Sequence, residues 1–120
     1  MKNQNLYKRF LCSLKGLRAA WESEKSFRSQ VVITLVIIPT IIFLKASALW
    51  WGIFLLIIGA TLASELFNTA LEGLCDHVRP EIHPQIGRIK DCAAAAVFML
   101  SLASCLIFLT FLLEKFGYLS

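Results

Sequence analysis

Three long stretches without a charged residue dominate the hydrophobic pattern of the chain: Ser29–Leu44, Ala46–Ser64 and Cys92–Leu113. A hydrocarbon core roughly 30 Å thick is crossed by about 20 helical residues, so each stretch predicts a membrane-spanning helix, of which the first is short. Only Lys45 separates the first two stretches. This close spacing predicts that the first two helices form an antiparallel hairpin.

The residues before the first stretch follow a different period. Their apolar side chains recur every three or four positions and share one face of a helix: Leu6, Phe10, Leu14, Leu17 and Trp21. The opposite face carries charged residues, among them Lys8, Lys15 and Glu22. Such a pattern predicts an amphipathic helix in the membrane interface. A partner-binding or targeting helix would show the same pattern.

Together these patterns predict an all-α membrane protein with an N-terminal amphipathic interfacial helix and three transmembrane helices. We expect a surface helix at residues 1–28, a cytoplasmic loop at 73–91, and spans at 29–44, 46–72 and 92–113. The second span includes a cytoplasmic extension. Composition agrees with this class, because 58% of the residues are hydrophobic and only 17% are charged, whereas soluble domains carry about 25% charged residues.

The distribution of positive charge predicts the orientation in the membrane. Of the 12 Lys and Arg residues, only Lys45 and Lys115 lie outside residues 1–30 and the predicted loop. The positive-inside rule therefore places the N-terminus and the loop in the cytoplasm. This topology explains the net charge of +4 better than nucleic-acid binding does, since the sequence has no basic stretch interleaved with aromatic residues.

The four cysteines, at positions 12, 75, 92 and 105, form no C-x-x-C pair and no zinc-ligand pattern. We expect them to be small packing residues.

The first apolar stretch begins too late in the sequence to be the core of a signal peptide, so we expect no cleavage of the N-terminus.

Polar side chains continue the second span along one helical face. Four of them are spaced to lie within about 80° around a helix and to stack over about three turns: Glu65, Asn68, Glu72 and Asp76. We call these four residues the acidic stripe. Carboxylates near hydrocarbon are costly unless they are neutralised, solvated or bound to cations. Alternatively, Glu72 and Asp76 form a solvated helix end and Glu65 alone pairs with a neighbouring helix.

Because the acidic stripe lies beside a basic loop, we expect a site that binds Mg²⁺ and phosphate groups. Carboxylate oxygens suit Mg²⁺, which takes one or two protein carboxylates together with water and substrate phosphates. The loop adds cations at Arg79, Arg88 and Lys90. A membrane phosphotransferase fits both features, although the 6 glycines form neither a P-loop nor a kinase glycine loop. A proton or ion conductor, or a non-catalytic assembly subunit whose stripe joins helices, would also carry such acids.

Three segments of the chain resemble one known family. The segment ELFNTALEGLCD, the following HPxxGRIKDxAAAAV and the upstream KGLRAAWESEKSFR are similar to the small prokaryotic diacylglycerol kinases, which include the undecaprenol kinases. The similarity runs from about Lys8 to about Val97. It implies an integral membrane lipid kinase of the bacterial cytoplasmic (inner) membrane. It also implies a homotrimer, with sites shared between subunits, that transfers the γ-phosphate of ATP to a lipid hydroxyl.

The resemblance also implies roles for individual residues. Glu65 corresponds to the general base of the family, and Glu24 and Glu72 correspond to residues that hold Mg²⁺. The positions that match the nucleotide and phosphate site are Asn68, Asp76, Glu81, His83, Lys90 and Asp91. We expect the lipid substrate to contact Glu65, Trp21 and Arg18.

Some of these residues also have simpler explanations. Glu24 would face the bundle if the surface helix were continuous, but it would equally suit a solvated helix end paired with Lys25 or Arg28. His83 lies in a proline-flanked segment, where a lone histidine is more often a surface residue. Lys90 is suited to follow the charge of a moving phosphoryl group, and a lysine that extends to the headgroups would look the same.

The lipid substrate is indicated less directly. The stretch LKGLRAAW is similar to the diacylglycerol kinases of Gram-negative bacteria, whereas the His83–Pro84 pair and the run Ala93–Ala96 are similar to the undecaprenol kinases. We therefore predict diacylglycerol kinase activity, with undecaprenol kinase activity as the alternative.

The nucleotide site departs from the family pattern at two positions. The family commonly uses an arginine and an aromatic residue where this chain has Asn5 and Cys12, so contacts to the base differ here.

Overall fold

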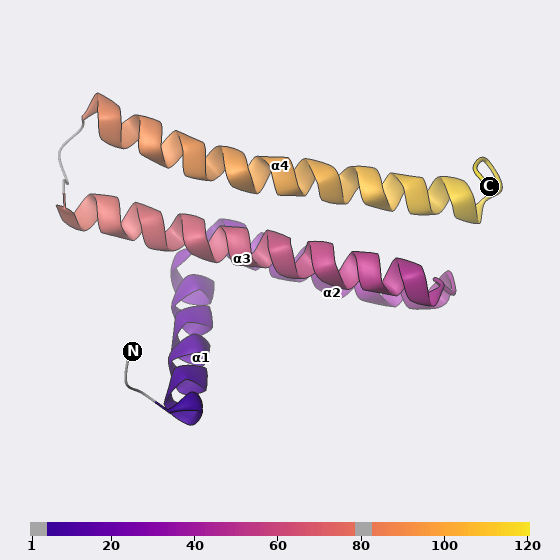
Figure 1. Ribbon diagram of the computed structural model, residues 1–120, viewed down its shortest axis with the longest axis horizontal. Helices are drawn as coiled ribbons and strands as arrows, with labels where there is room; N and C mark the ends of the chain where they lie inside the picture. Colours follow the sequence, from indigo (N-terminus) through magenta and orange to yellow (C-terminus); the bar gives the residue numbers. More distant parts are fainter. Residues whose placement is uncertain (1–4, 79–82) are drawn as a thin grey trace.

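The computed structural model describes residues 5–78 and 83–120, which fold into four helices (Figure 1). The helices are α1 (Leu6–Ser23), α2 (Lys25–Phe43), α3 (Ala48–Val78) and α4 (Pro84–Lys115). The last three are long and apolar enough to cross a membrane. The predicted all-α class, with an amphipathic helix followed by three spanning helices, is confirmed.

The amphipathic helix α1 leaves the bundle and runs across the direction of α3 (Figure 1). Asn5 caps its first turn, because the Asn5 side chain accepts a hydrogen bond from the backbone N–H of Lys8 at 2.9 Å. The apolar side chains predicted to share a face are exposed, from 81% for Leu6 to 42% for Leu17. A helix that crosses the direction of the spans with an exposed apolar face lies along the membrane plane.

The expectation of one continuous helix through Glu24 is wrong. Glu24 has extended backbone angles, φ −119° and ψ 112°, and it separates α1 from α2. Its backbone N–H still bonds to the carbonyl of Ala20 at 2.9 Å. The helix breaks at Glu24 because the chain changes direction there: α1 lies along the membrane and α2 crosses it. Such a change of direction needs a residue outside helical geometry.

Helix α3 is central, because it packs against both α2 and α4, while within the described residues the backbones of α2 and α4 do not approach one another. The buried core lies at the end of the bundle near the α2–α3 turn and consists of Ile41, Phe54 and Phe111. Trp50 packs edge-on against Phe111 with ring centroids 5.3 Å apart, and its indole N–H donates to Glu114 at 3.1 Å.

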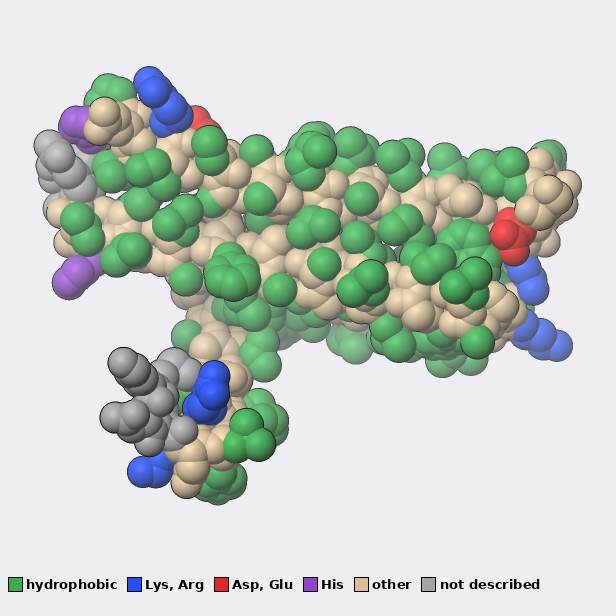
Figure 2. Space-filling view, in the orientation of Figure 1, with side chains coloured by type: hydrophobic (Ala, Val, Ile, Leu, Met, Phe, Trp, Pro, Cys, Tyr) green, Lys and Arg blue, Asp and Glu red, His purple; other side chains and the backbone are tan. Residues whose placement is uncertain are grey.

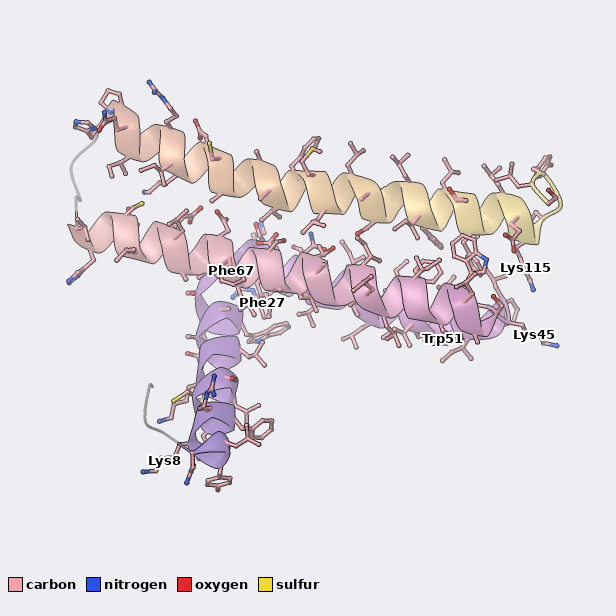
Figure 3. The ribbon with its side chains drawn as sticks, in the orientation of Figure 1. Lys8, Phe27, Lys45, Trp51, Phe67 and Lys115 are labelled. Atoms are coloured by element: carbon pink, nitrogen blue, oxygen red, sulfur yellow. The ribbon has the colours of Figure 1, made fainter. Side chains whose placement is uncertain are left out.

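The turn between α2 and α3 is tight. Lys45 adopts a positive φ of 55°, and the backbone N–H of Ala46 bonds back to the carbonyl of Ile41 at 3.0 Å. These bonds reverse the chain within a few residues. Helices α2 and α3 therefore form an antiparallel hairpin, and Figure 3 shows Lys45 and Trp51 near this end of the bundle.

The segment 73–91, predicted as a loop, is mostly helical. Helix α3 continues to Val78, and α4 begins at Pro84, with His83 as its N-cap accepting from the backbone N–H of Gln85 at 3.1 Å. The loop prediction is wrong for residues 73–78 and 84–91, because polar residues there keep helical spacing, as the acidic stripe already does up to Asp76. At about 1.5 Å per residue, α3 and α4 are each about 46–48 Å long and extend beyond a hydrocarbon core roughly 30 Å thick.

The cysteines predicted to be packing residues differ in exposure. Cys75 is buried and Cys12 is partly buried, but Cys92 and Cys105 are exposed on α4. The packing prediction is therefore right for Cys75 and wrong for the two cysteines of α4. A small residue on the outer face of a spanning helix meets lipid as readily as it meets another helix.

Phe111→Ala should lower the free energy of unfolding by about 2 kcal/mol, since it would leave roughly 100 Å³ unfilled at about 24 cal/mol per Å³. Lipid is as apolar as the core, so little transfer free energy adds to this packing loss. Denaturant unfolding in mixed micelles measures the change. Phe98→Ala is the matched control, because Phe98 is 64% exposed and should change stability little. Equal losses from both variants would show that the core does not lie where the structure has it.

Candidate active site

Glu65 is the buried acid of the bundle. Only 4% of the residue is exposed, although it lies on an apolar spanning helix. Gln30 of α2 lies within hydrogen-bonding reach of Glu65, and the Gln30 amide donates to the hydroxyl of Ser101 in α4 at 3.2 Å. The carboxylate therefore lies where α2, α3 and α4 meet.

The remaining residues of the acidic stripe continue toward the end of α3. The Asn68 amide donates to the Glu72 carboxylate at 3.3 Å. The amide oxygen of Asn68 is buried and accepts no hydrogen bond from the residues that the structure describes. A buried oxygen without a donor is costly, so Asn68 presents an acceptor that suits a cation or a donor group.

Glu24 approaches the stripe from the junction of α1 and α2. It is partly buried, and the charges of Glu24 and Glu72 both act on Glu65. Pairing of Glu24 with Arg28 is not observed, because the Arg28 guanidinium donates instead to the backbone carbonyl of Trp21 at 2.9 Å. Glu24 and Glu72 thus lie close enough to Glu65 for their charges to act on it, and such like charges favour the binding of positive charge.

The oxygen atoms of this region fit a hard divalent cation bound together with phosphates. In residues 5–78 and 83–120, no group of three or more His, Cys, Asp and Glu side chains is arranged to hold a metal by itself. Mg²⁺ seldom uses such a complete protein cage and usually takes one or two carboxylates, water and phosphate oxygens. Glu24, Glu72 and the unbonded Asn68 oxygen are donors of that kind.

Positive charge reaches the stripe from α4. The Lys90 ammonium pairs with the Asp76 carboxylate at 2.5 Å and remains about one-third exposed. The hydrogen bond that the Lys90 ammonium donates to Asp76 raises the pKa of Lys90, so the ammonium is charged at neutral pH. Lys90 precedes the uncharged stretch 92–113, and it contacts a side chain of α3 rather than only extending to the headgroups.

The other predicted residues are placed less closely. His83 caps α4 through its Nδ1 atom. Asp91 is exposed, and its side chain makes no hydrogen bond or ion pair to the described part of the chain. Arg18 pairs with Glu22 at 2.9 Å on the exposed face of α1. Trp21 lies on the same helix and is partly exposed. Glu81 lies outside the described residues.

Gln30 and Ser101 were not predicted as site residues. Each is a small polar residue within an otherwise apolar stretch, and this was the available signal. Gln30 also lines a groove of about 370 Å³ between α2, α3 and α4, whose other wall residues are mostly apolar, for example Ile33, Ile58 and Phe108. The register between helices, which brings Gln30 to Glu65, cannot be obtained from these positions alone.

The distribution of side chains is that of a membrane-embedded protein with a polar site at one end. Figure 2 shows hydrophobic side chains covering the long helices, with charged and histidine side chains gathered at the ends and on α1. Figure 3 shows Phe27 and Phe67 where α1 joins the bundle. Phe67 lies on α3, two residues from the buried Glu65. An apolar body with carboxylates and a lysine at one end suits the transfer of a phosphoryl group to a lipid.

The chain belongs to the prokaryotic diacylglycerol kinase family, whose family model matches residues 11–112. It is 33% identical over 93 residues to a diacylglycerol kinase of Helicobacter pylori (strain ATCC 700392 / 26695), covering 78% of this chain and 73% of that protein. The diacylglycerol kinase of Escherichia coli (strain K12) is 30% identical over 105 residues, covering 88% and 86%. The undecaprenol kinase of Bacillus subtilis (strain 168) is 29% identical over 109 residues, covering 91% and 89%.

This membership makes the chain an integral membrane lipid kinase that uses ATP to phosphorylate a lipid. The predicted enzyme class is confirmed. The acidic stripe alone was also compatible with an ion conductor or a non-catalytic assembly subunit. Membership in a kinase family favours the enzyme over both.

Asp76→Asn should lower the pKa of Lys90 toward its ordinary value of 10.5, because the carboxylate that favours the charged ammonium is removed. The sign follows from the raised pKa: stabilisation by this ion pair is present below the pKa of an unfolded lysine and is lost as pH rises through the higher folded value. An NMR titration of the Lys90 side chain in micelles measures the change. Glu22→Gln removes an exposed acid that pairs with Arg18 and should leave this titration unchanged.

Proposed function

We propose that this protein phosphorylates diacylglycerol with ATP and forms phosphatidic acid at the cytoplasmic surface of the bacterial inner membrane. The observation that carries the proposal is the buried Glu65 carboxylate between three apolar helices, with Glu24 and Glu72 near it and with Asp76, farther along α3, paired to Lys90. The names of the relatives from Helicobacter pylori and Escherichia coli support diacylglycerol as the acceptor. Undecaprenol is the second candidate, supported by the relative from Bacillus subtilis.

In this proposal Glu65 is the general base. Its carboxylate binds the acceptor hydroxyl and takes the proton as the hydroxyl oxygen forms a bond to the γ-phosphorus of ATP. The bond between the γ-phosphorus and the bridging oxygen breaks in the same displacement, and ADP leaves with the electron pair. Because the phosphoryl transition state is loose, alignment and electrostatics contribute more than base strength. No phosphorylated enzyme is needed.

Glu24 and Glu72 are proposed to hold Mg²⁺, and the unbonded oxygen of Asn68 supports the same position. When bound, the ion would offset negative charge on the phosphates of ATP. Glu24 brings its carboxylate from the junction between α1 and α2, so the surface helix and the bundle would both contribute to the site.

Lys90 is proposed to contact the transferring phosphate, since a charged ammonium near the stripe can stabilise the charge that builds on the equatorial oxygens. The nucleotide would also contact Asp76, which orients Lys90, and His83 and Asp91 at the start of α4. Glu81 keeps the nucleotide role that its resemblance to the family implies.

We further propose that the N-terminus is cytoplasmic and that three copies assemble, with sites shared between them. The charge distribution supports the orientation, and the family resemblance supports the homotrimer. Arg18 and Trp21 lie on the interfacial helix, where an exposed guanidinium and an indole are placed to contact the polar part of a lipid.

Purified protein in mixed micelles should transfer the γ-phosphate of radiolabelled ATP to diacylglycerol in the presence of Mg²⁺. A parallel reaction with undecaprenol compares the two acceptors. Glu65→Gln should reduce transfer by about 10²–10⁴-fold, the range of a lost general base, while ATP binding persists. Glu22→Gln is the control and should retain activity. An active Glu65→Gln enzyme would overturn the role of Glu65, and a preference for undecaprenol would replace the proposed substrate.

Glu24→Ala and Glu72→Ala should each raise the Mg²⁺ concentration that gives half-maximal activity, because each removes one proposed ligand. A tenfold to hundredfold increase is the order expected for loss of a metal contact. The measurement is a magnesium titration of ATP turnover at fixed lipid. Glu22→Ala is the matched control for Glu24, since it lies two residues away and faces Arg18. Unchanged magnesium dependence in both variants would contradict the ligand assignment.

A further inference from the structure

Gln30 is the polar residue that links the three spanning helices at the level of Glu65. Gln30 lies on α2, where its side chain is within hydrogen-bonding reach of Glu65 on α3. Its amide donates to Ser101 on α4 at 3.2 Å. A side-chain amide has two N–H donors, so both of these contacts can be made by the same NH₂ group. Gln30 therefore connects the predicted base with two other helices.

This link matters because α2 and α4 are otherwise joined mainly through α3. Within the described residues, the backbones of α2 and α4 do not approach one another, and both pack on α3. The apolar core of Ile41, Phe54 and Phe111 lies at the opposite end of the bundle. Between α2 and α4 runs the groove of about 370 Å³. The amide of Gln30 thus spans the gap at the end where the chemistry is proposed.

The contact has a direct effect on the Glu65 side chain. A glutamate has three side-chain torsions, and a buried carboxylate without a partner can adopt several rotamers at a high desolvation cost. A donated N–H fixes one carboxylate oxygen and leaves the other oxygen available. Ser101 in turn fixes the orientation of the Gln30 amide, since an amide held at two points cannot rotate freely.

We propose that Gln30 and Ser101 are positioning residues that hold the Glu65 carboxylate in the orientation needed to accept the proton of the lipid hydroxyl. The inference rests on the proposed role of Glu65 as the general base. Neither residue touches the transferring phosphate. Their contribution is alignment, on which phosphoryl transfer depends strongly.

Gln30→Leu keeps the approximate size of the side chain and removes both donors. It should lower kcat for lipid phosphorylation by about tenfold to hundredfold, the order of the loss caused by a misplaced catalytic group, with KM for ATP changed by less than about twofold. Ser101→Ala should lower kcat in the same direction by a smaller factor. Ser101→Thr keeps the hydroxyl and should restore most of the lost kcat.

Ser104→Ala is the matched control. Ser104 lies one helical turn from Ser101 and makes a hydroxyl contact of the same length, 3.2 Å, with Thr61 on α3. That contact also joins two helices, but it does not reach Glu65. If Gln30 and Ser101 only hold helices together, Ser104→Ala will reduce kcat as much as Ser101→Ala does. Thermal unfolding of each variant in micelles shows whether a loss of kcat accompanies a loss of folding.

The outcomes separate this inference from the proposed function. If Glu65→Gln is inactive while Gln30→Leu and Ser101→Ala keep wild-type kcat, the positioning role is wrong and the base assignment stands. If Glu65→Gln is active, the base assignment itself fails. If Gln30→Leu loses stability and raises KM for ATP together with the loss of kcat, the residue supports the fold rather than the carboxylate. A kcat loss at unchanged stability and KM, with rescue by Ser101→Thr, supports the inference.

Discussion

The burial of one carboxylate among apolar helices is the constraint that shapes the polar end of this protein. Glu65 is almost fully enclosed, and a buried acid is unfavourable unless polar neighbours compensate for the lost hydration. Gln30 supplies a donor, while Glu24 and Glu72 add negative charge instead of removing it. The cluster is therefore arranged to attract cations, and this is what a kinase that binds a polyphosphate at a lipid surface requires.

The two ends of the bundle differ in the contacts that join their helices. At one end, aromatic rings pack at centroid distances near 5.3 Å and join α3 to α4 without any demand for chemistry. At the other end, the helices meet through an amide, a hydroxyl and an ion pair of Asp76 with Lys90. A rigid apolar end can orient a polar end that needs free space for substrates. Helix α3 carries both, so the position of Glu65 depends on the packing of Phe54 more than two helical turns away.

Much of the architecture could be predicted from the sequence, because uncharged stretches of spanning length have few alternative structures in lipid. The acidic stripe was also predictable, since Glu65, Asn68 and Glu72 keep helical spacing. The break at Glu24 and the helical character of residues 73–91 were not, because polarity alone does not show where a helix ends. The contact of Gln30 with Glu65 depends on the register between two helices. The roles of Glu24 and Glu72 rested on family resemblance.

Because the backbone is extended at Glu24, the direction in which the side chains of α1 point is not fixed by helical continuity with α2. A residue inserted within α1 would rotate the preceding part of that helix by about 100° and leave Glu24, Gln30 and Glu65 in the same mutual arrangement. A residue inserted between Glu24 and Gln30 would turn one away from the other by the same angle. Changes in chain length are thus tolerable in α1 before Arg18 and disruptive between Glu24 and Gln30, so the stretch from Arg18 to Gln30 behaves as a segment of fixed length.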